Sequence, residues 1–298
     1  MADAVMMAQM ADKEGFIAAL DQSGGSTPGA LRLYGIAETD YSGEEEMFRL
    51  IHEMRVRIMT ARAFNGDKVI GAILFEKTMD GGAEGKPVPS YLWEDRRVVP
   101  FLKVDKGLAA EEDGAQVMKP MPDLDALLKR AVQKGIFGTK MRSVIGNADR
   151  RGIAAVVRQQ FEVGRRILGH GLVPIIEPEV SIKSPTKTEA EAILRDEIGR
   201  ELDALPAGER VMLKLTIPTV ADFYKPLVDH KAVLRVVALS GGYSRAEACE
   251  KLSHNHGMIA SFSRALAENL RSTMSEAEFE TSLAEAIDQI YVASTVKA

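Results

Sequence analysis

The sequence predicts an α/β fold, a single-domain (β/α)8 or TIM barrel with extra terminal helices, over residues 1–298. Three observations lead to this prediction. Short runs rich in Val, Ile and Leu alternate with longer amphipathic stretches, as in repeated βα units. The short runs number about eight, which is the count that a closed parallel barrel requires. No Pro/Ser-rich linker or change of composition divides the chain.

Each predicted strand is an apolar run of strand length. In chain order these are FIAALD (16–21), VIGAILF (69–75), VVPFLKV (98–104), IFGTKMRSV (136–144), LVPIIEPEV (172–180), VMLKLTI (211–217), LRVVALSGG (234–242) and MIASFSR (258–264). A doubly wound open sheet would also accommodate eight strands. However, no G-x-G-x-x-G follows the first strand and no G-x-x-x-x-G-K-[ST] occurs, so the barrel is favoured.

Helical periodicity occupies the segments between the strands. In residues 44–65, apolar side chains recur at three- and four-residue steps and form one face. Acidic residues in first turns and closing glycines mark helix ends. Further helices are predicted at 122–133, 149–171 and 186–205, with an extra terminal helix at 275–294. Residues 77–97, which follow the second strand, have no regular pattern and are predicted to form a functional βα loop.

Composition excludes several kinds of partner. The net charge is -5, from 38 basic and 43 acidic residues, which argues against nucleic acid and against an anionic membrane surface. Cys249 is the one cysteine, so no intrachain disulfide is expected and a cytoplasmic location is favoured. The sequence contains no signal-peptide pattern and no apolar run near 18 residues, so no membrane span is predicted. A small-molecule ligand is expected, and the sequence is compatible with a homo-oligomer.

Charged residues lie near the carboxyl ends of five predicted strands. Side chains two residues apart share one face of a strand, so residues at this spacing point the same way. A single charge at a strand end often marks only where the chain leaves the core. Matching parity on five strands instead predicts a shared polar cavity at the end of the barrel where active sites form. These residues are Asp21, Lys103, Lys140, Arg142, Glu177, Glu179 and Lys214.

Lys214 lies in the apolar stretch RVMLKLTIP, where an unpaired ammonium would cost several kcal/mol. Apolar walls and a nearby cation such as Lys140 would favour a neutral amine, which is a nucleophile toward a carbonyl group. The alternative is an ion pair with Glu177 or Glu179 that keeps the lysine charged, and the spacing leaves both open. Two crowded carboxyls can hold a proton near neutral pH and so assist carbinolamine dehydration, while Asp21 could act as a separate base.

Two glycine-containing turns are candidate phosphate sites. The SGG turn at 240–242 follows the seventh strand, and Arg264 follows the eighth, where barrels commonly bind phosphate. The SGGS turn at 23–26 follows the first strand, with Arg142 and Lys103 as cationic partners. Each could equally be an ordinary tight turn. Two anion sites on opposite edges of one cavity would suit a substrate phosphorylated at both ends.

Seven motifs, in this order, resemble those of the class I fructose-bisphosphate aldolases, the metal-independent Schiff-base enzymes: LDQSGGS, KVDKG, TKMR, PIIEPEV, LKLTIP, LSGGYS and SFSRAL. They extend from residue 16 to near 270, and the chain resembles the shorter bacterial members. The resemblance implies reversible cleavage of fructose 1,6-bisphosphate to dihydroxyacetone phosphate and glyceraldehyde 3-phosphate, in glycolysis and gluconeogenesis, with no metal or other cofactor. The alternatives are an aldolase for another phosphorylated ketose, such as tagatose 1,6-bisphosphate, and a non-catalytic binding barrel.

The resemblance also implies a role for each site residue. Lys214 would form the Schiff base, Asp21 would be the acid/base at the C4 hydroxyl, and Glu177 the acid/base of iminium formation. Glu179 would orient Glu177, and Lys140 would stabilise charge beside the Schiff base. The implied phosphate-binding residues are Ser23, Ser26, Lys103 and Arg142 on one side, and Ser240, Gly241, Gly242 and Arg264 on the other.

The chain departs from the family pattern at three places. Animal members end in a tyrosine that exchanges a proton at the enamine, whereas this chain ends VASTVKA, with Tyr291 the nearest tyrosine. In SFSRAL the spacing before the arginine is shorter. After SGGS the chain reads TPGALR and lacks the basic residue expected soon after, so that phosphate site is predicted to be built differently.

The H-x-H of His254 and His256 is short of partner ligands, and no metal site is predicted.

Overall fold

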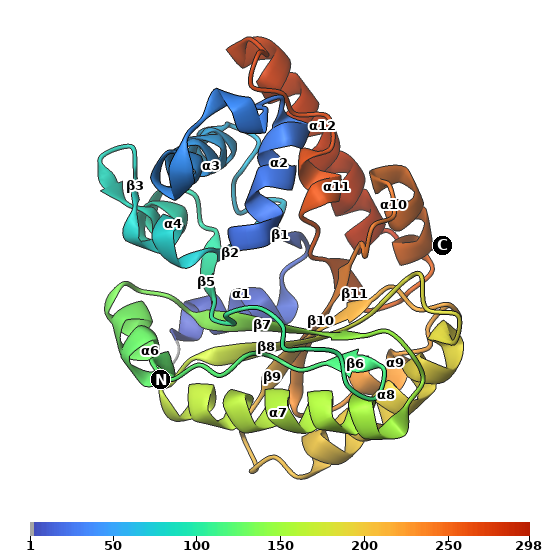
Figure 1. Ribbon diagram of the computed structural model, residues 1–298. Helices are drawn as coiled ribbons and strands as arrows, with labels where there is room; N and C mark the ends of the chain where they lie inside the picture. The colour runs from blue at the N-terminus through green and yellow to red at the C-terminus, as the bar shows by residue number, and fades with distance from the viewer. Residues whose placement is uncertain (1–2) are drawn as a thin grey trace.

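A computed structural model describes residues 3–298 and contains a closed parallel barrel (Figure 1). Within these residues eight strands form one parallel sheet in the order in which they follow along the chain. They are β1 (Phe16–Leu20), β2 (Val69–Leu74), β5 (Val99–Lys103), β7 (Gly138–Ile145), β8 (Val173–Val180), β9 (Val211–Thr216), β10 (Val233–Leu239) and β11 (Met258–Ala260). The Ala19 amide donates to the Phe262 carbonyl at 3.0 Å, which joins the first strand to the last. All eight predicted strands are therefore confirmed, and so is the barrel.

Helices surround the barrel, as the alternating pattern predicts. The longer ones are α3 (Gly43–Thr60), α6 (Leu124–Gln133), α7 (Arg150–Gly169), α8 (Lys187–Asp203), α10 (Arg245–Ser253) and α12 (Glu276–Thr295). The helix predicted over 44–65 ends at Thr60, because Ala61 leaves the helical region with ψ of 144°. The shorter ones are α1 (Ala4–Asp12), α2 (Thr27–Tyr34), α4 (Glu76–Asp80), α5 (Val88–Ser90), α9 (Lys225–Val228) and α11 (Arg264–Ala267), with 3-10 turns η1 (Gly24–Ser26) and η2 (Glu38–Asp40) and a π turn η3 (Tyr91–Asp95).

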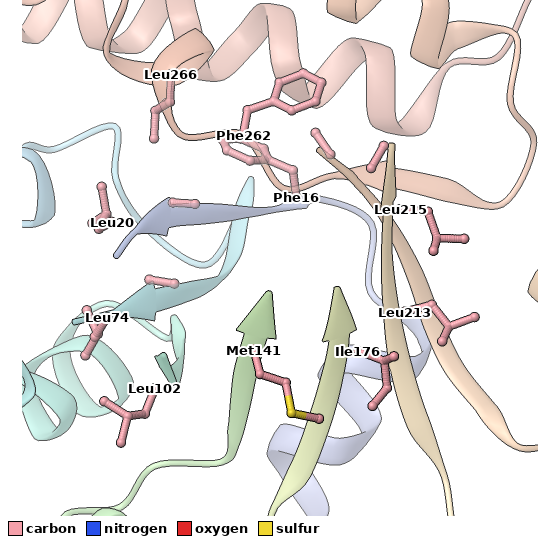
Figure 2. Close-up of a cluster of buried hydrophobic side chains, with 14 of the residues drawn as sticks. Phe16, Leu20, Leu74, Leu102, Met141, Ile176, Leu213, Leu215, Phe262 and Leu266 are labelled. Atoms are coloured by element: carbon pink, nitrogen blue, oxygen red, sulfur yellow. The ribbon is translucent and has the colours of Figure 1, made fainter. Parts of the chain in front are cut away.

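Alternate residues of each strand face two separate cores. Outward residues such as Leu102, Met141 and Ile176 belong to the large cluster between the strands and the helices, part of which Figure 2 shows. Inward residues such as Phe101 and Ile175 form a second cluster inside the barrel. Because side chains alternate along a strand, the two cores follow directly from the period of two in the sequence.

Helix α1 closes the amino end of the barrel. Its Met6 and Met10 belong to the inner core, and its Gln9 side chain donates to the carbonyls of Ile70 (2.9 Å) and Arg97 (2.8 Å). The guanidinium of Arg235, on β10, donates to carbonyls at the last turn of α1. The apolar filling of the barrel is thereby completed at this end, and the opposite end is left for a cavity.

Residues 77–97 do not form the irregular loop that the sequence predicted. They contribute to α4, a short hairpin of β3 (Gly82–Ala83) and β4 (Lys86–Pro87), then α5 and η3. Met79, Val88 and Leu92 are buried in the outer core. The prediction of an irregular loop is therefore wrong, and of residues 3–298 those that line the cavity described below include none from 77–97. The segment packs against the outside of the barrel because this packing removes its apolar side chains from water.

One further short strand, β6 (Ala115–Gln116), pairs antiparallel with β7 beside the loop that follows β5.

As to the membrane, none of the helices in residues 3–298 combines the length and the apolar character that a span requires.

Candidate active site

A cavity of about 760 Å³ opens at the carboxyl ends of the strands. Every predicted site residue except Gly242 lines it: Asp21, Ser23, Ser26, Lys103, Lys140, Arg142, Glu177, Glu179, Lys214, Ser240, Gly241 and Arg264. Gly242 lies at its edge in the same turn as Gly241, where a β-carbon would stand 3.5 Å from an Arg264 nitrogen. The shared cavity predicted from strand parity is present.

The charged wall continues the inward face of the strands. Lys103 follows Phe101 by two residues, and Lys214 follows Met212 by two; both preceding residues belong to the inner core. Glu177 follows Ile175 in the same way. Each of these three strands therefore fills the barrel with an apolar side chain and then presents a charged one at the rim.

Lys140 lies at the centre of an ion cluster. Its Nζ is 2.6 Å from Asp21 Oδ2 and 3.0 Å from Glu177 Oε2, and all three side chains are at least nine-tenths buried. Burial alone would lower the pKa of Lys140, but the two carboxylates outweigh it and hold that pKa well above the ordinary value. Burial would raise the pKa of Asp21, but Lys140 and Lys214 hold it well below the ordinary range. Asp21 is therefore ionised and Lys140 charged at neutral pH.

Lys214 contacts the other oxygen of Glu177. Its Nζ lies 3.1 Å from Glu177 Oε1, and both side chains are 5% exposed. This is the lysine–carboxylate contact that the sequence left as the alternative to a free amine. An ion pair at this distance also brings a carboxylate within reach of a proton on an ammonium group. Lys140 Nζ lies 3.0 Å from the second oxygen of the same carboxylate, so Glu177 is shared between the two lysines.

Glu179 lies on the same side of β8 and pairs with a different cation. Its Oε2 is 2.9 Å from Arg142 Nη1, and its side chain is 17% exposed. Burial raises the pKa of Glu179, with a further rise from the charge of Glu177, and Arg142 opposes them. Glu179 is the second carboxyl of the predicted crowded pair, and it is more easily protonated than an ordinary glutamate.

Lys103 joins the first candidate phosphate turn to the rim of β5. Its Nζ donates to Ser23 Oγ at 2.7 Å and lies 3.1 Å from Asp105 Oδ1. Ser26 Oγ accepts from the Ser23 amide at 3.0 Å and thus fixes the turn. Asp105 was not predicted, although its spacing of two from Lys103 in KVDKG is the signal by which the other residues were found.

Arg32, the last residue of TPGALR, places a cation on the cavity wall six residues after Ser26, where SGGS ends. The residue lies on α2 and lines the cavity beside Ser26. Its side chain is 68% exposed, and its Nη1 stands 3.5 Å from a Glu38 oxygen. Sequence reasoning missed it because a cation placed on the following helix has no strand parity to reveal it.

The second candidate phosphate turn also lines the cavity. Ser240, Gly241 and Arg264 line it together with Ser261 and Ser263, which the sequence analysis did not select. Gly241 has φ of 61°, and a β-carbon there would stand 2.7 Å from Ile182 Cγ2. Glycine is therefore required at this turn by its left-handed backbone and by the close side chain.

The carboxyl-terminal tail is fastened away from the cavity. Lys297 Nζ donates to the carbonyls of Leu252, Met258 and Ala293, and Met258 is the first residue of β11. Tyr291 lies 3.4 Å from a Glu14 carboxylate oxygen rather than on the cavity wall. The tail thus lies near the amino end of the last strand, opposite the charged rim.

The fold and the cavity define a TIM-barrel protein with lysines and carboxylates clustered at the carboxyl ends of its strands. The structure is similar to that of fructose-bisphosphate aldolase from Plasmodium falciparum, solved in complex with TRAP and a small-molecule inhibitor. The TM-score is 0.79 at 20% identity, over 99% of this chain and 95% of that one. A Corynebacterium glutamicum protein is similar with a TM-score of 0.56 at 14% identity, over 98% and 93% of the two chains. These likenesses show the fold.

Sequence comparison identifies the family. The family model for fructose-bisphosphate aldolase class-I matches residues 6–198. Proteins named fructose-bisphosphate aldolase class 1 from Synechocystis sp. and Porphyromonas gingivalis are each 57% identical over 286 residues, which is 96% of this chain and 95% and 97% of theirs. The chain therefore belongs to the class I fructose-bisphosphate aldolase family, and the resemblance expected from its motifs is confirmed.

Proposed function

We propose that this chain cleaves fructose 1,6-bisphosphate reversibly to dihydroxyacetone phosphate and glyceraldehyde 3-phosphate through a Schiff base on Lys214. The observation that carries the proposal is the position of Glu177, whose two oxygens lie 3.1 Å from Lys214 Nζ and 3.0 Å from Lys140 Nζ. One carboxylate is thus within reach of the nucleophile and is oriented by a second, permanently charged lysine. Membership of the class I family supports the substrate and the reaction.

The first half of the reaction builds the iminium ion. Glu177 takes a proton from Lys214, whose free amine then attacks the C2 ketone to form a carbinolamine. Glu177 returns a proton to the carbinolamine hydroxyl, which leaves as water, and the C=N bond forms. Glu179 stands next to Glu177 on the same face of β8 and, with its raised pKa, would assist these proton transfers.

The second half breaks the carbon–carbon bond. Asp21, kept ionised by Lys140, takes the proton of the C4 hydroxyl while the C3–C4 bonding electrons move to the iminium nitrogen. Glyceraldehyde 3-phosphate leaves, and an enamine of dihydroxyacetone phosphate remains on Lys214. Protonation at C3 followed by addition of water to C=N releases the second product and restores the lysine. The protonated imine is the electron sink, so this sequence of steps runs on side chains alone.

The two anion sites would hold the ends of the substrate. One consists of Ser23, Ser26, Lys103 and Arg142, with Arg32 as an added cation. The other consists of Ser240, Gly241, Gly242 and Arg264. Serine hydroxyls, main-chain amides and guanidinium groups are the donors that phosphate oxygens prefer.

We also infer that residues 1–298 act as one domain in the cytoplasm, in keeping with the single cysteine and the unbroken composition.

Borohydride trapping tests the proposal. Dihydroxyacetone phosphate and borohydride should leave a stable secondary amine at Lys214, found by mass spectrometry of the digested protein. Lys214→Met should remove both the adduct and cleavage, because it deletes the nucleophile. Lys187→Met is the matched control, since Lys187 is a partly buried lysine, paired with Glu191 outside the cavity, and should still permit labelling of Lys214.

Three results would contradict parts of this proposal. A protein that forms no adduct is a binding barrel, and an adduct at another lysine removes Lys214 from the mechanism. The third concerns the substrate. If kcat/KM for tagatose 1,6-bisphosphate exceeds that for fructose 1,6-bisphosphate, the reaction class holds but the substrate assignment is wrong.

A further inference from the structure

Arg55, on α3, is a buried charge beneath the proposed site. Its side chain is among the largest that are fully buried, with an exposure of 1%. Within residues 3–298 its guanidinium takes part in none of the ion pairs, and its hydrogen-bond partners are the uncharged groups of Thr78 and Gln22. An ion buried without a partner is costly, so its neutral hydrogen-bond acceptors must compensate.

Those acceptors belong to two segments at the carboxyl ends of β1 and β2. Nη1 donates to Thr78 Oγ1 at 2.8 Å, and Nη2 donates to the main-chain carbonyl of Gln22. The guanidinium carbon also lies 6.0 Å from the centre of the Phe75 ring. Gln22 stands between Asp21, the proposed base at C4, and Ser23, which receives a hydrogen bond from Lys103. Arg55 therefore holds the peptide that connects the two.

The Gln22 side chain extends this contact across the seam of the barrel. Its Oε1 is 3.4 Å from Arg55 Nη2, and its Nε2 donates to Ser263 Oγ at 2.8 Å. Ser263 directly precedes Arg264, the cation of the second anion site. Arg55 is thus connected through Gln22 to Ser263, and this connection joins the segments that follow the first and the last strand. It lies one step beyond the main-chain hydrogen bond between Ala19 and Phe262, which joins the same two strands.

Charge as well as position relates Arg55 to Asp21. Burial lowers the pKa of Arg55 to about 10, while the charge of Asp21 opposes the shift. The guanidinium therefore stays charged at neutral pH and adds to the positive field around Asp21. A neutral hydrogen-bonding side chain could hold the Gln22 carbonyl but could not supply this field.

We propose that Arg55 is a positioning residue for carbon–carbon cleavage, which holds Gln22 so that Asp21 and Ser23 keep their places at the rim. The inference rests on the proposed function, because it assigns Asp21 to the cleavage step. Arg55 lies behind the first strand and is not needed for attack by Lys214. Its loss should therefore slow cleavage far more than iminium formation.

The test separates these two steps in Arg55→Met. Displacement of a catalytic group by about 1 Å costs roughly 100-fold, so kcat for fructose 1,6-bisphosphate cleavage should fall by about that factor. The rate of borohydride trapping with dihydroxyacetone phosphate should change by less than about threefold, because it reports the Lys214 step alone. Arg55→Lys keeps the charge and one donor, and it should recover part of kcat.

Arg57→Met is the matched control. Arg57 lies on the same helix and is 19% exposed, but it donates to Tyr34 and to the Met274 carbonyl instead of to the rim. Its loss should lower stability and leave the ratio of cleavage to trapping unchanged. If Arg55→Met lowers both rates by one common factor, or if Arg57→Met changes the ratio equally, Arg55 is only structural and the inference falls.

Two further outcomes separate failure of the inference from failure of a variant to fold and from failure of the proposed function. Should Arg55→Met fail to fold, Arg55→Lys takes its place, because it keeps the buried charge but not the two-armed contact with Thr78 and the Gln22 carbonyl, and it should lower the same ratio to a smaller extent. An unchanged ratio in a folded Arg55→Lys protein would overturn the inference. If the parent protein forms no adduct at Lys214, it is the proposed function that has failed, and the trapping assay shows this before any Arg55 variant is compared.

Discussion

Replacement of Lys140 by methionine removes the cation between two buried carboxylates. The distances of 2.6 Å to Asp21 and 3.0 Å to Glu177 correspond to about 6 and about 5.5 kcal/mol of Coulomb attraction at an effective dielectric constant of about 20. The cost of burying the lysine itself disappears at the same time. Breaking a buried pair by removal of one partner therefore costs a net ~3–5 kcal/mol. We expect Lys140→Met to lose about that much unfolding free energy at pH 7.

The loss should depend on pH, and its sign follows from Asp21. In the parent protein the pKa of Asp21 is depressed, so its contribution to stability is present above the unfolded pKa of about 3.9 and is lost only as pH falls through the folded value. Without Lys140, the burial that raises the pKa of Asp21 loses its largest opposing charge, so that pKa moves upward. As pH falls from 7 to 4.5 the native variant binds protons that the unfolded chain does not, which stabilises it. The difference from the parent should therefore shrink at pH 4.5.

Urea unfolding followed by circular dichroism at both pH values measures the effect, alongside the cleavage rate at pH 7. Cleavage should fall roughly 100-fold or more, since one fixed charge beside the reacting groups is lost. Lys187→Met breaks another lysine–glutamate pair, one with a buried carboxylate outside the cavity, and should cost stability without slowing cleavage. A loss below about 1 kcal/mol that is equal at both pH values, or undiminished cleavage, would refute the reasoning.

Two other changes test the electrostatics of the site and of the tail. Arg142→Met removes the cation that opposes the raised pKa of Glu179, so the acidic limb of the kcat profile should move to higher pH; an unmoved limb would mean that Glu179 takes no part. Burial lowers the pKa of Lys297 to about 8, below the unfolded value of about 10.4, so between these values the unfolded chain binds more protons and stability should rise with pH. Lys297→Met should abolish that rise in urea titrations and leave cleavage unchanged, whereas slowed cleavage would show that the tail acts at the site.

The site was predictable from sequence to the extent that it lies on strands. Lys140 with Arg142 and Glu177 with Glu179 were found because a spacing of two fixes which side of a strand a residue faces, whatever its surroundings. Asp105 carries the same signal and could have been found by it. Arg32 and Arg55 could not, because they lie on helices, where the face toward the cavity depends on how the helix packs.

The pairing of the charges was likewise beyond the sequence. Asp21 and Glu177 lie on strands that are not neighbours in the sheet, and they share Lys140 only because the barrel closes. The sequence therefore left Lys214 with two alternatives, a free amine or an ion pair. The structure shows that its neighbour is Glu177, while Glu179 turns to Arg142.

The wrong prediction for residues 77–97 has a related cause. An irregular stretch after a strand is a good candidate for a functional loop, but Met79, Val88 and Leu92 are drawn onto the outside of the barrel by burial. The same holds for α1, whose Met6 and Met10 fill the amino end of the barrel. The periodicity of the sequence does not show against which part of the barrel either segment packs.

By itself the sequence determined the number of strands, the faces of their side chains and the family to which the chain belongs. Only the tertiary structure decided which cation meets which carboxylate, where the tail is fastened and that Arg55 lies under Gln22. The physical reason is the separation along the chain of the residues that interact. The alternation of faces in a strand arises between adjacent residues. An ion pair across a barrel forms between residues from distant parts of the chain, which the closed sheet brings together.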